Sequence, residues 1–294
     1  MQENNQANRG KYIWWIFLPM IIYMAIQNAI QFMIMEVTLI YSFATIEASS
    51  YDDLLTKLLS NSFSQESVTA VYLVSATVTM ALFAFLYMKN CHKPGKSLVR
   101  GIADNGPLCI AGIVILVLGM QYLTNYLING LAIMFPSWLD QYNSLLESAG
   151  LSDSMSVGMT IYTVILGPIV EEIAYRGLTF KAALKVMDYK WAIFVQALLF
   201  GFMHMNWLQG CYAFVFGLVL GYVMYRYDNL LVTMVIHIAF NLMGTYGSSL
   251  LQTGDNTLMS FFIWFLGSMI VTYAGLLLLS KAAPGQLVEP TGQE

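Results

Sequence analysis

The stretch GMTIYTVILGPIVEEIAYRGLTFKAALKV, residues 158–186, decides the fold of this chain. It begins as an apolar run long enough to cross a membrane. Glu171 and Glu172 stand in its middle, and Arg176 follows one helical turn later. Each such residue costs about 2.5–3.5 kcal/mol at the centre of a bilayer. Because charges persist there only where partners compensate them or chemistry needs them, we interpret the stretch as an acid/base element inside a membrane.

The composition supports a membrane protein. Of the 294 residues, 58% are hydrophobic and 10% are charged, and the mean hydropathy is +0.64. Soluble proteins average about 25% charged residues, so this chain is too apolar to cover a water-facing surface in the usual way. The three cysteines are odd in number and show no CxxC spacing, which indicates neither a disulfide framework nor a cysteine zinc site.

Repeated apolar runs predict an all-α polytopic protein of the cell membrane with about eight spans. The expected spans are residues 12–43, 68–88, 108–135, 158–186, 191–205, 211–225, 230–250 and 258–280. Of the 13 Lys and Arg residues, Lys57 lies in an acidic loop and Arg176 within a span, while the other 11 fall on one side. Because positive charge gathers on the cytoplasmic side, we expect both termini to be cytoplasmic.

Three segments between or within the spans carry further expectations. Residues 44–67 are expected to form an acidic polar loop, and residues 206–210 a short turn. Residues 136–150 have the apolar spacing of a short interfacial helix. Gln27, Asn28 and Gln31 interrupt the first span, where they either hydrogen-bond to neighbouring helices or line a wet cavity.

Two of the three histidines, His204 and His237, lie inside apolar spans. Counting from the basic ends of their spans, Glu171, His237 and His204 lie about 15, 12 and 20 Å deep. All three can therefore meet at one level of a core about 30 Å thick. Phe200 is one turn from His204, and Gly201 beside it permits a close approach of another helix.

Helical spacing predicts which of these groups share a face. Glu172 and Arg176 are four residues apart, so the guanidinium can neutralise that carboxylate. Glu171 points about 100° away and is free for another role. His237 and Asn241 are also four residues apart and can face one cavity. A lone histidine in a membrane helix is often an interhelical hydrogen-bonding group, but two beside a buried pair of glutamates favour a chemical role.

Three motifs carry a family resemblance. They are EEIAYRG at residues 171–177, FGFMH at 200–204 and HIAFN at 237–241, which read Glu-Glu-x-x-x-Arg, Phe-x-x-x-His and His-x-x-x-Asn. In this order on successive spans they resemble the CPBP intramembrane proteases. That family includes the CAAX-prenyl endopeptidase type and bacterial members linked to bacteriocin processing and self-immunity. The resemblance covers about residues 158–245.

The resemblance implies hydrolysis of a peptide bond without a covalent intermediate. Glu171 is expected to be the general base that activates a water. His204 is expected to orient that water or share its proton. His237 and Asn241 are expected to donate hydrogen bonds to the oxyanion of the tetrahedral intermediate.

Glu172 and Arg176 are expected to pair and shape the site. This mechanism requires no cofactor. A zinc version would use the same residues, with Glu171, His204 and His237 as metal ligands, although the HExxH signature is absent. We favour the glutamate-activated water and keep Zn²⁺ as the alternative.

The order of the spans predicts an organisation of the chain, and the resemblance implies its catalytic core and its partners. We expect an N-terminal cytoplasmic segment (1–11), peripheral spans with loops (12–157), a catalytic transmembrane core (158–250), a last span (251–281) and a disordered tail (282–294). The expected partners are the lipid bilayer and a membrane-associated protein or peptide, either a CAAX-type tail or a bacteriocin or leader-type peptide, and no nucleic acid. The competing functions are a proton-coupled transporter, which uses buried carboxylates as relays, and a non-catalytic immunity or scaffold protein.

Overall fold

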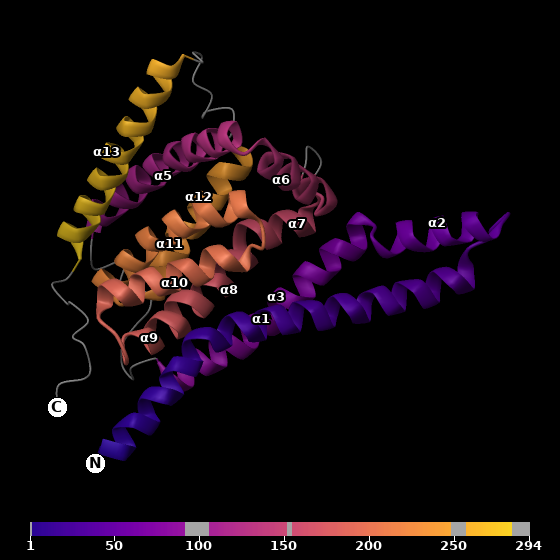
Figure 1. Ribbon diagram of the computed structural model, residues 1–294, viewed down its shortest axis with the longest axis horizontal. Coiled ribbons are helices and arrows are strands. Elements are labelled where there is room, and N and C mark those ends of the chain that lie inside the picture. Colours follow the sequence, from indigo (N-terminus) through magenta and orange to yellow (C-terminus); the bar gives the residue numbers. More distant parts are fainter. Residues whose placement is uncertain (1, 92–105, 152–154, 248–256, 284–294) are drawn as a thin grey trace.

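The computed structural model describes residues 2–91, 106–151, 155–247 and 257–283, and within these the chain is all-α (Figure 1). The helices are α1 (Gln2–Thr45), α2 (Tyr51–Ser62), α3 (Gln65–Asn90), α5 (Gly106–Met134), α6 (Pro136–Ser148), α7 (Val157–Ile161), η1 (Tyr162–Leu166), α8 (Gly167–Glu172), η2 (Ile173–Thr179), α9 (Phe180–Ala183), α10 (Tyr189–Met203), α11 (Trp207–Tyr227), α12 (Leu230–Tyr246) and α13 (Leu258–Ala282). The predicted fold class is confirmed in this respect.

Six helical segments of the described chain are long and apolar enough to cross a membrane. They coincide with six of the eight predicted spans. The two other predicted spans are α10 and α12, which have 15 and 17 residues. At 1.5 Å per residue these helices are about 22 and 26 Å long, shorter than a hydrocarbon core of about 30 Å. A multi-pass membrane protein follows, while eight complete crossings remain a prediction.

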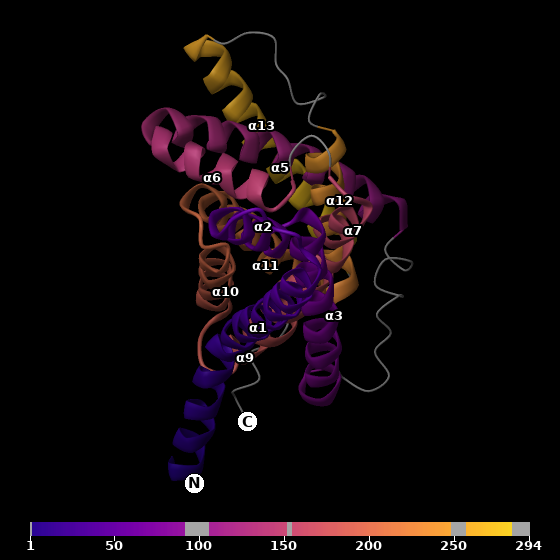
Figure 2. The same ribbon diagram turned by 90° about the vertical axis from the view of Figure 1, so that its right-hand side faces the viewer.

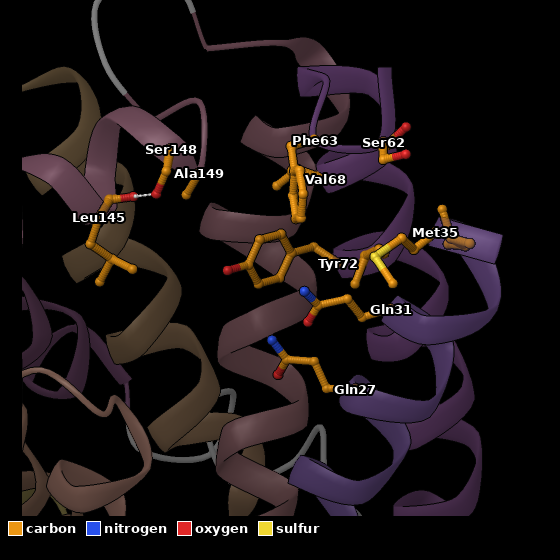
Figure 3. A pocket seen from close by; sticks show the side chains of 13 residues that line it. Gln27, Gln31, Met35, Ser62, Phe63, Val68, Tyr72, Leu145, Ser148 and Ala149 are labelled. Carbon is orange, nitrogen blue, oxygen red and sulfur yellow. Dashed lines mark hydrogen bonds between the residues drawn. The ribbon is translucent and has the colours of Figure 1, made fainter. Parts of the chain in front are cut away.

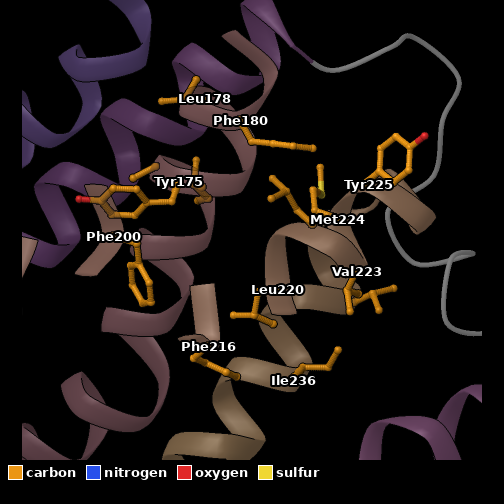
Figure 4. Packing of buried hydrophobic residues seen from close by; sticks show 14 of the residues in the cluster. Tyr175, Leu178, Phe180, Phe200, Phe216, Leu220, Val223, Met224, Tyr225 and Ile236 are labelled. Atoms are coloured by element: carbon orange, nitrogen blue, oxygen red, sulfur yellow. The ribbon is translucent and has the colours of Figure 1, made fainter. Parts of the chain in front are cut away.

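The central helices form the buried core of the molecule. The side chains of η2, α9, α10, α11 and α12 interdigitate around Phe200, Phe216 and Leu220 (Figure 4). On one side α5 packs along α13, where Gly119 leaves space for the backbone of Thr272. On the other side α1, α2 and α3 form an arm that extends away from the core (Figures 1 and 2). The core thus holds the helix with the two adjacent glutamates between two flanking helix groups.

Three basic side chains connect neighbouring helices at one end of the bundle. Arg9 of α1 donates a hydrogen bond to the carbonyl of Val186 after α9, and Lys181 of α9 pairs with Asp228 after α11. Arg226 of α11 donates to the carbonyl of residue 280 near the end of α13. These contacts agree with the predicted clustering of positive charge. The basic loop at residues 92–105 and the tail at 284–294 lie outside the described residues, and the cytoplasmic assignment stays a prediction.

The structure corrects two boundaries. The expected acidic loop at residues 44–67 contains a helix, α2, because Ser50 caps the N–H of Asp53 and apolar leucines recur at helical spacing. The expected turn at 206–210 is shorter, because Asn206 caps the N–H of Gln209 and the helix already begins at Trp207. The short helix predicted at residues 136–150 is present as α6, and its interfacial position stays a prediction.

Candidate active site

The helix that carries Glu171 and Glu172 widens on both sides of them. Residues 162–166 and 173–179 are π-helical, and α8 lies between. The cause of the first widening is Pro168, which has no N–H and cannot continue an ordinary α-helical ladder. Gly167 donates its N–H to the carbonyl of Tyr162, five residues back. Turns of this kind are frequent at functional sites.

The same proline explains the position of Asn241. In π-helical geometry the carbonyl of Thr163 would accept a hydrogen bond from the N–H of the residue five positions later. That residue is Pro168, which has no backbone N–H. The side chain of Asn241 on α12 donates to this carbonyl at 2.8 Å from Nδ2 to O. Asn241 therefore joins α12 to the glutamate helix, and the second N–H of its amide is left for another acceptor.

Glu172 is the fixed centre of the site. It is fully buried, and its Oε1 lies 3.0 Å from Nη1 of Arg176 and 2.8 Å from Nδ1 of His237. The predicted pairing of Glu172 with Arg176 is thus present. Arg176 is also fully buried, and its guanidinium stacks on the ring of Phe200 at 4.5 Å. Because a carboxylate only accepts hydrogen bonds, Nδ1 of His237 carries a proton.

Glu171 faces the other side of the same imidazole. Its Oε2 lies 3.6 Å from Nε2 of His237, and its side chain is 13% exposed. This separation exceeds a direct hydrogen bond and can be bridged by a water beside the two atoms. His237 therefore links both glutamates, through Nδ1 to Glu172 and through Nε2 to Glu171. The sequence did not predict this contact, because it depends on how α12 is rotated.

His204 lies at the end of α10, next to this pair. Its Nδ1 is 2.9 Å from the carbonyl oxygen of Phe200, so that nitrogen donates and Nε2 is left as an acceptor. The Phe200 ring contacts the imidazoles of both His204 and His237 edge to face. Gly201 permits the tight α10–α11 hairpin, since a Cβ there would lie 2.6 Å from the Gly210 carbonyl oxygen. The predicted close approach at Gly201 is confirmed.

Three tyrosines that sequence reasoning missed lie within electrostatic range of Glu171. The carboxylate of Glu171 interacts electrostatically with the hydroxyls of Tyr23, Tyr162 and Tyr175. The Tyr23 and Tyr162 hydroxyl oxygens lie 3.4 Å apart. Tyr175 is four residues after Glu171, a spacing from which its position could have been predicted. Tyr23 comes from α1, which no motif connects with the site.

The residues named for a zinc site do not assemble as a ligand set. Among the described residues, no group of three or more His, Cys, Asp and Glu side chains has an arrangement that could hold a metal ion. Nδ1 of His237 is directed at Glu172, and Nδ1 of His204 is directed at a carbonyl. We therefore derive no step through a metal, and the zinc alternative remains a prediction for metal analysis.

The six predicted site residues thus lie on three neighbouring parts of the core. Glu171, Glu172 and His237 are brought together directly. Arg176 and Asn241 fix the surrounding helices, and His204 is connected through the Phe200 ring.

Part of the chain matches the model of a known protein family. Residues 153–243 match the family model described as type II CAAX prenyl endopeptidase, Rce1-like. The matched segment contains all six predicted site residues. No curated protein and no solved structure matches the chain.

Proposed function

Because residues 153–243 form a domain of the Rce1-like type II CAAX prenyl endopeptidase family, we propose that this chain is an intramembrane endopeptidase in which Glu171 activates the hydrolytic water. The observation that carries the proposal is the imidazole of His237 held between Glu171 and Glu172. A purely structural ion pair needs one carboxylate for Arg176. The second carboxylate, that of Glu171, lies 3.6 Å from Nε2 of His237, and these two groups together form an acid/base pair.

The charge balance of the site assigns one mobile proton. Glu172 and Arg176 neutralise each other, while Glu171 adds a further negative charge on a side chain that is only 13% exposed. Burial of an unpaired charge is costly, so one additional proton belongs between Glu171 and Nε2 of His237. The proposed mechanism proceeds from the form in which Nε2 of His237 holds this proton and Glu171 is ionised.

The proposed reaction uses this proton arrangement. Glu171 accepts a proton from water as the water oxygen bonds to the scissile carbonyl carbon. His237, through Nε2–H, and the free N–H of Asn241 donate to the resulting oxyanion. The protonated Glu171 then gives its proton to the leaving amine as the C–N bond breaks. His204 orients the water through Nε2, and the products are a carboxyl group and an amine.

The proposed substrate is a membrane-associated polypeptide. A prenylated CAAX tail and a leader-type or bacteriocin peptide both present a peptide bond at the membrane. The family match favours the first class.

Comparative proteomics of membranes tests the function. Cells producing the wild-type chain should contain at least one new protein terminus that is missing from cells producing Glu171→Gln. A matched control is Glu66→Gln, which changes a glutamate at the start of α3, and it should retain the terminus. Equal amounts of folded protein are verified by size-exclusion chromatography. A terminus that is produced equally in the Glu171→Gln cells would refute glutamate catalysis.

A further inference from the structure

Gln196 is a polar side chain that the core encloses completely. It belongs to α10, about two turns before His204, and its exposed fraction is 0%. Gln27 and Gln31 on α1 differ from it, because they line a surface groove between α1, α3 and α6 (Figure 3). Whether water fills that groove stays a prediction. An enclosed amide must find its partners within the protein, so the contacts of Gln196 require an explanation.

Two carbonyls fix the amide of Gln196. Its Nε2 donates to the carbonyl of Ile193 within α10 at 2.9 Å, and to the carbonyl of Gly217 on α11 at 2.8 Å. Because a carbonyl only accepts hydrogen bonds, the amide nitrogen must face both oxygens, which uses both of its N–H groups. Gly221 provides the space, since a Cβ there would overlap Nε2 of Gln196. The amide therefore has one orientation between α10 and α11.

The carbonyl of Gly217 is also a partner of Arg176. Nη2 of the guanidinium lies 3.5 Å from this oxygen, whereas Nε2 of Gln196 lies 2.8 Å from it. Nη1 of the same guanidinium lies 3.0 Å from Oε1 of Glu172. Two donors cannot occupy the same place, so the closer one, Gln196, limits how far the guanidinium can move toward α11. Loss of the amide would leave the Gly217 oxygen to Arg176 and draw the guanidinium away from Glu172.

This chain of contacts continues into the site. The Glu172 oxygen that pairs with Arg176 also accepts from Nδ1 of His237 at 2.8 Å, and Nε2 of that imidazole faces Glu171. We propose that Gln196 is a positioning residue, which keeps the guanidinium directed at Glu172 and thereby holds the imidazole of His237 in place. The inference rests on the proposed function and adds to it a residue outside the three sequence motifs.

Gln196→Met tests this role, because methionine has a similar length and no N–H. Oε1 of Gln196 is buried and has no hydrogen-bond partner among the described residues, and both carbonyls lie inside helices whose ladders also supply donors. The melting temperature should therefore stay within about 3 °C of wild type or rise. A displacement of about 1 Å can cost about 10²-fold in rate. A smaller displacement, relayed through Arg176, should lower kcat on the substrate found by proteomics by about tenfold and leave KM unchanged.

Gln121→Met is the matched control. Gln121 on α5 is also buried, and its Nε2 donates to the carbonyl of Phe240 on α12. This variant removes the same kind of amide next to the helix of His237 and leaves the contact at Gly217 intact, so it should retain its kcat. A wild-type kcat in Gln196→Met would overturn the positioning role. An equal loss of kcat in both variants would also overturn it, because general packing would then explain the effect.

Moving a carboxylate tests the contact without any substrate. Glu172→Gln removes the charge that compensates the buried guanidinium and should lower the melting temperature. Adding Gln196→Glu places a carboxylate beside the same guanidinium, so it should recover at least about half of that loss, whereas adding Gln121→Glu should recover none. Absence of recovery with Gln196→Glu would overturn the placement of this side chain. If the unsubstituted chain cleaves nothing, the proposed function fails, and these melting temperatures still decide whether residue 196 directs the guanidinium.

Discussion

The substitution Glu172→Gln separates the structural carboxylate from the carboxylate that we assign to chemistry. Glu172 is fully buried and accepts hydrogen bonds from Arg176 and His237 through one oxygen. The amide removes the charge that compensates the fully buried guanidinium. Removing one partner of a buried ion pair costs about 3–5 kcal/mol. For a chain of this size class, that loss lowers the melting temperature by about 6–20 °C.

Tryptophan fluorescence during heating in one detergent provides the assay, since the chain has six tryptophans. The matched variant Glu171→Gln should melt within about 3 °C of wild type, because Glu171 is partly exposed and does not pair with Arg176. Adding Arg176→Met to Glu172→Gln should recover part of the loss, since no buried charge is then left unpaired. Equal melting temperatures for Glu172→Gln and Glu171→Gln would refute this reasoning.

Four further predictions concern the same site. His237→Ala should reduce cleavage by about 10²–10³-fold through loss of an oxyanion donor, measured as kcat on the identified substrate; retention of wild-type kcat would remove His237 from the mechanism. Asn241→Leu should destabilise the protein by about 1–3 kcal/mol, because it leaves the Thr163 carbonyl without its partner, and unchanged melting would contradict that bond. Gly201→Ala should lower the melting temperature, since the new Cβ would lie 2.6 Å from a carbonyl oxygen of α11, whereas Gly267→Ala, with nothing within 4 Å, should be neutral. Incubation with a chelator should leave cleavage unchanged and elemental analysis should find less than one zinc per chain, while loss of activity that Zn²⁺ restores would favour the metal mechanism.

The sequence predicted best those features that depend on one helix. The pairing of Glu172 with Arg176 follows from a spacing of four residues, and both are found together. Hydropathy located the apolar segments, because membrane helices must satisfy their backbone internally whatever their neighbours are. Gly201 was recognised as a contact point for the same local reason.

Features that depend on several helices could not be predicted in this way. The contact of Glu171 with His237 requires the rotations of two separate helices. Tyr23 reaches the site from the first helix of the chain, far from any motif. The first π-helical turn, at residues 162–166, had a usable signal in Pro168, since its missing N–H predicts an interruption of the ladder there. The helix α2 also had a usable sequence signal, because the cap residue Ser50 is followed by leucines at helical spacing.

The rate of peptide hydrolysis by purified Glu171→Gln protein tests the central claim most directly. The assay uses a peptide that spans the junction found in the membrane proteome, with wild type and Glu66→Gln at equal concentration. A general base contributes about 10²–10⁴-fold, so the account predicts a fall of that size in Glu171→Gln and none in Glu66→Gln. A folded Glu171→Gln protein that cleaves within tenfold of the wild-type rate would contradict the account.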